Sequence, residues 1–382
     1  IIMTSRERVL AAVAGQQPDR VPVFANISRS HARELADELA DELSAQRNAH
    51  SVKPDEPLPC FVADRVSYTE ILLKLGNDAV AVGPGQRPPK PAPRQSKAAG
   101  EAPDRSTDLT DEWGLTSRKV GHHIEIIGRP LTEAASIDDI ESWRAPDPTE
   151  PWRWDIARGE IETYKNEYAV IGFTGVNAFE TAWNLTGFEK FLMDFMTGEV
   201  YTHHLLDKLF DFSLKSGRKL IDLGVDFIWL GDDVGTQDGM LLPPDFWREN
   251  LKPRMAALIS DFKNRDPDVK IIYHSCGSIL PIIPDLIEIG LDVLNPIQPL
   301  AKDMSLKNIK ENYGDKLSFL GGVDIQRTLP MGSEQEIAEH IADRIQAGSE
   351  NGGYIIAPAH IIQPDTSVEK VKAFFKYALR FG

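Results

Sequence analysis

The sequence is poor in cysteine and has no long apolar run. Only two cysteines, Cys60 and Cys276, occur among its 382 residues, and their wide separation predicts no disulfide framework, which is typical of a reducing cytoplasm. We find no uninterrupted apolar segment long enough to cross a bilayer. No signal peptide is expected either, because residues 3–6 lead directly into an amphipathic pattern. We therefore expect a cytoplasmic protein.

Basic residues are also in deficit. Lys and Arg number 42 against 58 Asp and Glu, which gives a formal net charge of −16. Such a charge disfavours nucleic acids and anionic membranes as partners. It also disfavours a polyanionic substrate, unless a local basic pocket overrides the overall field. With 42% hydrophobic and 26% charged residues, the composition is that of a soluble globular protein.

A dinucleotide-binding fingerprint is absent, since no Gly-x-Gly-x-x-Gly follows the first expected strand. Instead, short apolar runs, nearly all separated by helical patterns, are predicted as strands. They span residues 20–25, 78–83, 168–173, 227–231, 269–274, 292–297, 317–322 and 354–357. This alternation predicts an α/β fold, a closed (β/α)8 TIM barrel in a single domain over residues 1–382. An open doubly wound sheet is the alternative if one early strand is misassigned.

An insertion is expected at about 84–150, after the second strand. Residues 84–103 are rich in Pro, Lys, Arg and Ala, which predicts an exposed loop. Residues 110–115 and 123–127 lie on either side of Gly121 and predict a hairpin. Among the helices, the patterns predict one at 30–46, one at 66–75 and a long helical region at about 178–224.

The stretch from Lys270 to Gly277 combines a strand pattern with two metal-binding residue types. It begins as an apolar run typical of a buried strand and breaks at Gly277. His274 and Cys276 point to the same side of an extended segment, because side chains alternate with a period of two. An imidazole and a thiolate supply two ligands of a catalytic zinc site. The alternative is a buried His beside a buried Cys, both only packed in the core.

Other polar side chains follow the expected strands, where a barrel gathers its functional residues. His360 comes after the eighth strand and would face His274 and Cys276 across the barrel mouth, so it is predicted as the third metal ligand. Glu180 is a candidate for a fourth, exchangeable ligand, with a place on a helix surface as the alternative. Six further residues at these strand ends are expected to contact substrate: Asn26, Arg29, Asn177, Gln237, Gln298 and Gln326.

Three carboxylates are predicted as catalytic residues that orient the substrate or hold the metal ligands. Asp232 and Asp233 come directly after the fourth strand, where a loop cap is the alternative role. Asp324 follows the seventh strand, where it could instead cap a helix.

Several motifs resemble those of the uroporphyrinogen decarboxylase superfamily, particularly its cobalamin-linked methyltransferase-like members. The matching stretches are Arg20-Val21-Pro22-Val23, Asp232 to Gln237, His274-Ser275-Cys276-Gly277, Gly321 to Gln326 and Gly353 to His360. The resemblance covers nearly the whole chain and implies a (β/α)8 barrel. Porphyrin decarboxylases carry an arginine-rich segment after the first strand that holds substrate carboxylates. Residues 24–31 lack it, so decarboxylation of uroporphyrinogen is not expected here.

The methyltransferase branch binds zinc through His-x-Cys and a later Cys. His274 and Cys276 match, while His360 stands in the place of the later Cys, and imidazole is a competent zinc ligand. The resemblance implies a zinc-dependent methyltransferase that moves a methyl group between a small methoxy or thiol compound and a corrinoid (cobalamin) carried by a separate protein. It also suggests a possible homodimer. Two alternatives stay open: a metal-independent decarboxylase of a small carboxylate, and a non-catalytic ligand-binding barrel.

Overall fold

The computed structural model describes residues 2–39, 68–92, 108–120 and 123–382. At its centre lies a curled sheet of seven strands in the order β1-β6-β7-β8-β9-β10-β11, and every neighbouring pair is parallel. The strands are β1 (Ala79–Val82), β6 (Ala169–Phe173), β7 (Phe227–Gly231), β8 (Lys270–His274), β9 (Val293–Asn295), β10 (Ser318–Val323) and β11 (Tyr354–Pro358). These strands confirm the second to the eighth of the expected strands.

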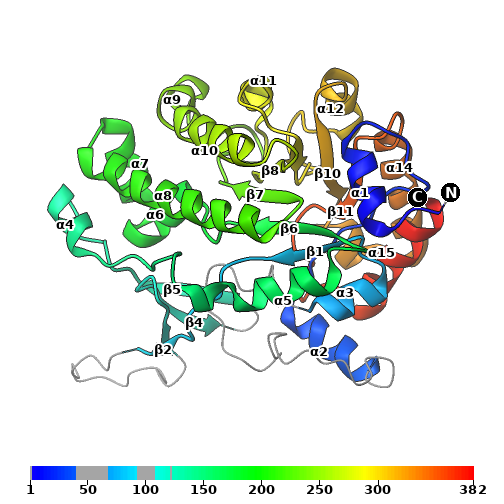
Figure 1. Ribbon diagram of the computed structural model, residues 1–382, viewed down its shortest axis with the longest axis horizontal. Coiled ribbons are helices and arrows are strands. Elements are labelled where there is room, and N and C mark those ends of the chain that lie inside the picture. Colours follow the sequence, from blue (N-terminus) through cyan, green and yellow to red (C-terminus); the bar gives the residue numbers. More distant parts are fainter. Residues whose placement is uncertain (1, 40–67, 93–107, 121–122) are drawn as a thin grey trace.

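Helices cover the outer face of the curled sheet (Figure 1). The α/β class is therefore confirmed, and the arrangement is consistent with a (β/α)8 barrel. The helices that precede β6 are α1 (Ser5–Val13), α2 (Arg29–Glu38), α3 (Thr69–Leu75), α4 (Ile137–Ser142), η1 (Pro151–Trp154) and α5 (Asp155–Tyr164). Those that follow it are α6 (Ala178–Thr186), α7 (Phe188–Thr197), α8 (Val200–Leu223), α9 (Pro244–Asn250), α10 (Lys252–Arg265), η2 (Leu280–Ile282), α11 (Ile283–Glu288), α12 (Leu306–Tyr313), α13 (Thr328–Met331), α14 (Glu334–Gly348) and α15 (Val368–Phe381).

The first expected strand, residues 20–25, is not a regular strand. Val23 forms only an isolated parallel bridge with β11. On the side that faces β1, two of its N–H groups bond to side chains instead of backbone carbonyls. Asp78 Oδ2 accepts from Val23 N–H at 2.8 Å, and Asn77 Oδ1 accepts from Ala25 N–H at 2.9 Å. The prediction of a strand was wrong here because side chains take the place of the backbone ladder.

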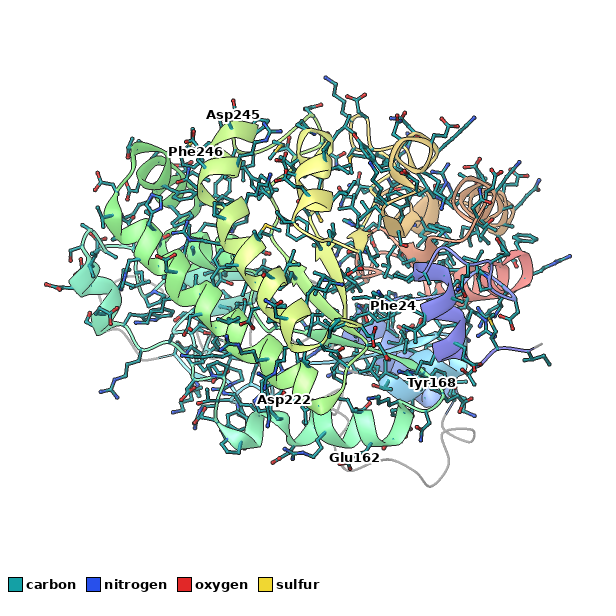
Figure 2. The ribbon with its side chains drawn as sticks, turned by 45° about the horizontal axis from the view of Figure 1, so that its top comes forward. Phe24, Glu162, Tyr168, Asp222, Asp245 and Phe246 are labelled. Atoms are coloured by element: carbon teal, nitrogen blue, oxygen red, sulfur yellow. The ribbon has the colours of Figure 1, made fainter. Side chains whose placement is uncertain are left out.

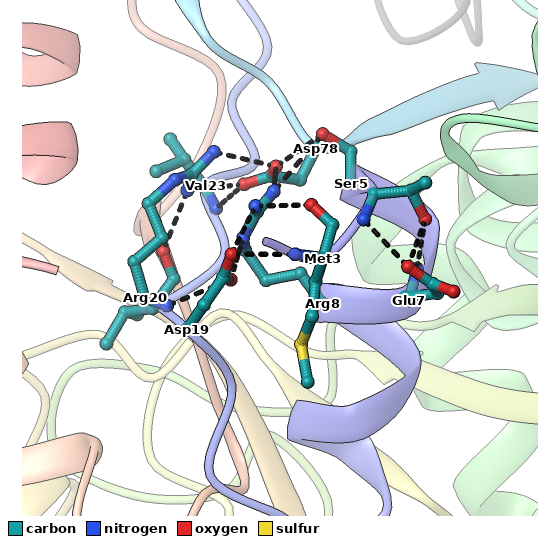
Figure 3. Close-up of polar contacts among 10 residues, drawn as sticks. Met3, Ser5, Glu7, Arg8, Asp19, Arg20, Val23 and Asp78 are labelled. Carbon is teal, nitrogen blue, oxygen red and sulfur yellow. Dashed lines mark hydrogen bonds and ion pairs between the residues drawn. The ribbon is translucent and has the colours of Figure 1, made fainter. Parts of the chain in front are cut away.

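The carboxylate of Asp78 also joins this segment to α1 (Figure 3). It is fully buried and accepts from the guanidinium of Arg8 at 2.7 Å and from that of Arg20 at 2.7 and 2.8 Å. Ser5 Oγ donates to the same carboxylate at 2.7 Å. Asp19 binds the Arg8 guanidinium as well, at 2.6 Å. Charge-assisted hydrogen bonds thus fasten the N-terminal helix to the start of β1.

A second, antiparallel sheet lies between β1 and β6 in the chain, in the order β2-β3-β4-β5. Its strands are β2 (Lys90–Pro91), β3 (Leu109–Thr110), β4 (Thr116–Val120) and β5 (His123–Gly128). The partner of β5 is β4 and not the expected arm at residues 110–115. That arm was misplaced because the Asp111 carboxylate accepts from Trp113 N–H and Leu115 N–H at 2.9 Å, which turns the chain. Residues 93–107 of the expected loop lie outside the described residues.

The long helical region expected at 178–224 consists of three helices, α6, α7 and α8. Gly187 and Gly198 separate them, with φ angles of 111° and 85° that glycine adopts without a steric penalty. The helix expected at 30–46 is present as α2, but residues 40–67, which include Cys60, lie outside the described part of the chain.

Acidic side chains are spread over the outer helices. Figure 2 shows Glu162 of α5, Asp222 of α8 and Asp245 of α9, and all three are exposed, whereas Phe24 is buried inside the sheet. Among the described residues, no helix combines the length and the apolar character that crossing a membrane would require.

Candidate metal centre

Strand β8 brings the first two predicted ligands to one end of the sheet. His274 is its last residue and is 3% exposed. Its Nε2 atom lies 3.5 Å from Sγ of Cys276, which is half-buried in the following loop. The ring of Trp229, on the neighbouring strand β7, stacks on the imidazole with ring centroids 5.9 Å apart and planes inclined by 28°. The strand pattern therefore placed both side chains correctly on one side.

His360, two residues after β11, completes the cluster. One ligand atom from each of His274, Cys276 and His360 can be chosen so that all three lie within 4.8 Å of one another. The two imidazole rings have centroids 5.9 Å apart and planes inclined by 65°. The loop is fixed on both sides of His360, where Ala359 N–H donates to β10 at 2.8 Å and Ile362 N–H donates to a backbone carbonyl at 3.0 Å. The three residues converge as expected, and metal binding by them remains a prediction.

The donor set of this cluster fits zinc. Imidazole nitrogen and thiolate sulfur bind zinc at about 2.0–2.3 Å, so the ligand atoms of a tetrahedral site lie about 3.5 Å apart. The separation between His274 and Cys276 is already 3.5 Å. The longer separations, up to 4.8 Å, would have to shorten by about 1 Å when a metal binds. Three protein ligands leave a fourth position open, as in a catalytic zinc site.

Asn295 contacts the first ligand and was not among the predicted residues. It is the last residue of β9 and is 4% exposed. Its Oδ1 lies 2.5 Å from Nδ1 of His274, and its Nδ2 donates to the carbonyl of Leu320 at 3.0 Å. The sixth expected strand, 292–297, extended past Asn295, so a search for polar residues after the strand ends passed over it; the observed strand ends at Asn295.

Asp233 and Gln298 hold the loop that carries the thiol. Asp233 Oδ1 accepts from Cys276 N–H at 2.9 Å and lies 3.6 Å from Nε2 of His274. Gln298 Oε1 accepts from Gly277 N–H at 2.8 Å. Both predicted residues therefore lie at the cluster, and both support its backbone.

Asp232 caps helix α6 from the neighbouring strand. Its Oδ1 accepts from Phe179 N–H at 2.7 Å and from Glu180 N–H at 3.0 Å, two groups that have no intrahelical partner. The residue before the helix, Asn177, makes no capping bond and instead donates from Nδ2 to Glu180 Oε2 at 2.8 Å. Burial raises the pKa of the Asp232 carboxyl well above its ordinary value, against these two N–H bonds. These contacts match the capping alternative, and a catalytic role stays a prediction.

Asp324 organises the turn that leads into α13. Its carboxylate accepts from Gln326 N–H at 2.8 Å and from Thr328 N–H at 2.9 Å. Burial opposes ionisation, but these N–H bonds outweigh it and hold the pKa of Asp324 below its ordinary value. The contacts again match the capping alternative.

A small cavity of about 30 Å³ adjoins His274 and His360. Its walls are mostly apolar, and they include the rings of Phe24 and Trp229. Asn26 lines this cavity, and its contact with a substrate stays a prediction. The other five residues predicted to contact substrate do not line it. Among them, Arg29 is the first residue of α2, and Gln237 and Gln326 are exposed.

Comparison with known proteins shows the family and the fold of the chain. The family described as Uroporphyrinogen decarboxylase (URO-D) matches residues 123–381. The uroporphyrinogen decarboxylase of Nostoc sp. is 23% identical to the chain over 258 residues, which cover 66% of this chain and 70% of that protein. The methylated-thiol–coenzyme M methyltransferase of Methanosarcina mazei is 20% identical over 198 residues, which cover 52% of this chain and 50% of that protein.

A solved structure, a methyltransferase from Methanosarcina mazei, has the same fold. It superimposes with a TM-score of 0.67 at 20% sequence identity and covers 99% of both chains. Because the family match spans more than half of the sequence, the resemblance read from the motifs is confirmed, and the chain belongs to the uroporphyrinogen decarboxylase (URO-D) family.

Proposed function

We propose that this protein is a zinc-dependent methyltransferase that moves a methyl group between a small methoxy or thiol compound and a corrinoid carrier. The observation that carries the proposal is the convergence of His274, Cys276 and His360, which come from β8, from the loop that follows it and from the loop after β11. A methylated-thiol methyltransferase among the relatives supports methyl transfer as the reaction class.

The three side chains would hold zinc, which acts as a Lewis acid that lowers the pKa of a bound thiol or polarises a methyl–oxygen bond. The protein's own residues prepare the site. Asp233 fixes the backbone of Cys276, and the Trp229 ring restricts the orientation of His274. The apolar walls of the adjoining cavity exclude water from the reacting groups.

The corrinoid would arrive on a separate protein. Its docking place would be the end of the sheet where the loops after β8 and β11 meet, because the cluster lies there. The small compound would occupy the open fourth position, and the corrinoid would approach the transferred methyl group from the end of the sheet.

Metal analysis tests the zinc site. Protein purified without chelator should contain about one zinc per chain, as expected for one three-ligand site. Cys276→Ser and His360→Ala should each lose most of this zinc, whereas Cys60→Ser, the matched control on the other cysteine, should keep it. Methylcobalamin mixed with a small thiol should then lose its methyl group only with the zinc-loaded forms. A folded wild-type protein that takes up no zinc would contradict the proposal.

A second candidate function is decarboxylation of a small carboxylate without a metal. It is favoured by the three curated relatives described as uroporphyrinogen decarboxylases, which are 23–24% identical to this chain. Release of carbon dioxide from a small acid, unchanged by a chelator and by Cys276→Ser, would support it over methyl transfer.

A further inference from the structure

The contact between Asn295 and His274 joins two neighbouring strands. The two residues are register partners in the parallel pairing of β8 with β9. The distance between Asn295 Oδ1 and His274 Nδ1 is 2.5 Å, and the residues are 4% and 3% exposed. At this depth, buried polar groups depend on their protein partners for hydrogen bonds. The two side chains therefore determine the direction of this bond between them.

The orientation of the Asn295 amide determines which atom carries the proton. Its Nδ2 donates to the carbonyl oxygen of Leu320 at 3.0 Å. If the amide were flipped, its Oδ1 would face the carbonyl oxygen of Leu320 at the same distance, with no hydrogen atom between the two oxygens. Oδ1 therefore faces the imidazole, and an amide oxygen only accepts. It follows that Nδ1 of His274 carries the proton, and that the neutral ring has its lone pair on Nε2.

Two groups near Nε2 favour the opposite tautomer. Asp233 Oδ1 lies 3.6 Å from Nε2 of His274, and Cys276 Sγ lies 3.5 Å from it. Either group, when ionised, would accept a hydrogen bond from a proton on Nε2. Such a proton would prevent metal ligation, because a ligating imidazole nitrogen must offer its lone pair. The hydrogen bond to Asn295 requires the proton on Nδ1 and therefore opposes the effect of Asp233 and Cys276.

We propose that Asn295 is a positioning residue that keeps the proton of His274 on Nδ1 and so presents Nε2 to a metal. The benefit of placing the proton on Nδ1 depends on the proposed zinc site. The position of the proton, however, is a property of the metal-free protein and is measured without zinc.

The first test uses the ¹⁵N chemical shifts of histidine side chains in the metal-free, full-length protein, with His274→Gln to assign the signal of His274. His31 is the internal control. It is equally buried, and its Nε2 lies 2.7 Å from the carbonyl oxygen of Thr366, which only accepts, so its proton is on Nε2. One spectrum should show the Nδ1–H form for His274 and the Nε2–H form for His31. The Nε2–H form at His274 would overturn the proposal.

The second test compares two variants of the same residue. Asn295→Leu has a similar volume but no acceptor. Asn295→Asp keeps an oxygen acceptor toward Nδ1 in a side chain of nearly the same shape. Asn295→Leu should shift His274 to the Nε2–H form and weaken zinc binding about 10–100-fold, as measured by competition with a chromophoric chelator. Asn295→Asp should retain the Nδ1–H form and most of the affinity.

The outcomes separate a role in proton placement from simple packing. An unchanged tautomer in Asn295→Leu, or equal losses of affinity in the two variants, would overturn the proposal. If Asn295→Leu does not fold, the wild-type spectrum and Asn295→Asp still decide. A wild-type protein that shows the Nδ1–H form but binds no zinc would refute the proposed function, and the role of Asn295 in placing the proton would stand.

Discussion

Replacing Asp78 with alanine should destabilise the fold by about 3–5 kcal/mol, the usual cost of removing one partner of a buried ion pair. The Asp78 carboxylate is 0% exposed and forms ion pairs with both Arg8 and Arg20. Arg8 is 8% exposed, so water cannot replace the carboxylate there, whereas Arg20 is 24% exposed and reaches solvent. Val23 N–H loses its acceptor as well, which alone costs about 1–3 kcal/mol. The loss is a large part of the 5–15 kcal/mol that typically stabilises a native protein.

Equilibrium unfolding in urea, followed by circular dichroism, measures this loss. Asp19→Ala is the matched control, because it removes a carboxylate that binds the same Arg8 guanidinium but is 25% exposed. We expect it to cost about 1 kcal/mol, as for other accessible ion pairs. A loss for Asp78→Ala that is no larger than the loss for Asp19→Ala would refute the reasoning from burial.

Three further perturbations test other parts of the structure. Gly277→Ala should lower both stability and zinc content, because Gly277 has a φ of +80° and a Cβ there would lie 2.5 Å from the carbonyl carbon of Gly235. Urea unfolding and metal analysis measure the two effects, and wild-type values in both would contradict the prediction. Burial raises the pKa of Asp111 to about 6, above the value of 3.8 taken for an unperturbed carboxyl. The folded state thus holds this proton more tightly than the unfolded state, so the free energy of unfolding should fall as pH rises from about 4 to about 6. The fall should be about 2 kcal/mol larger than in Asp111→Asn. Parallel curves of unfolding free energy against pH for the two proteins would rule this out. The Arg8 guanidinium lowers the pKa of Asp19 to about 2, so this carboxylate stabilises the fold above pH 4 and loses its effect as pH falls toward 2. Acid unfolding of Asp19→Asn should therefore be less steep than that of the wild type, with a difference of about 1 kcal/mol between pH 4 and pH 2.

The sequence predicted the strands where the apolar pattern alone decides the structure. Strand β7, for example, is buried on both faces, so its residues 227–231 form an unbroken apolar run with recognisable ends. The segment at residues 20–25 has the same apolar character. On the side that faces β1, however, its N–H groups bond to the side chains of Asn77 and Asp78, and no local pattern reveals that a side chain more than 50 residues away replaces the ladder there.

The candidate site shows the same division between local and long-range information. His274 and Cys276 were found because their spacing places them on one side of a strand. His360 was found because a closed sheet brings the ends of its strands together. Asn295 was missed because its contact with His274 depends on the register between β8 and β9 and on the carbonyl of Leu320. Neither can be predicted from the residues around Asn295 in the sequence.

The loop that carries His360 borders the irregular junction of the sheet. Ile362, two residues further on, bridges to Ile27, and its N–H bonds to Asn26. Under the proposed function, metal binding and the stability of this junction would be linked equilibria, since a metal that restrains His360 would also restrain the strand end beside it. Under the proposed function, loading with zinc would slow amide hydrogen exchange at Ile362, more than 80 residues along the chain from the His-x-Cys motif.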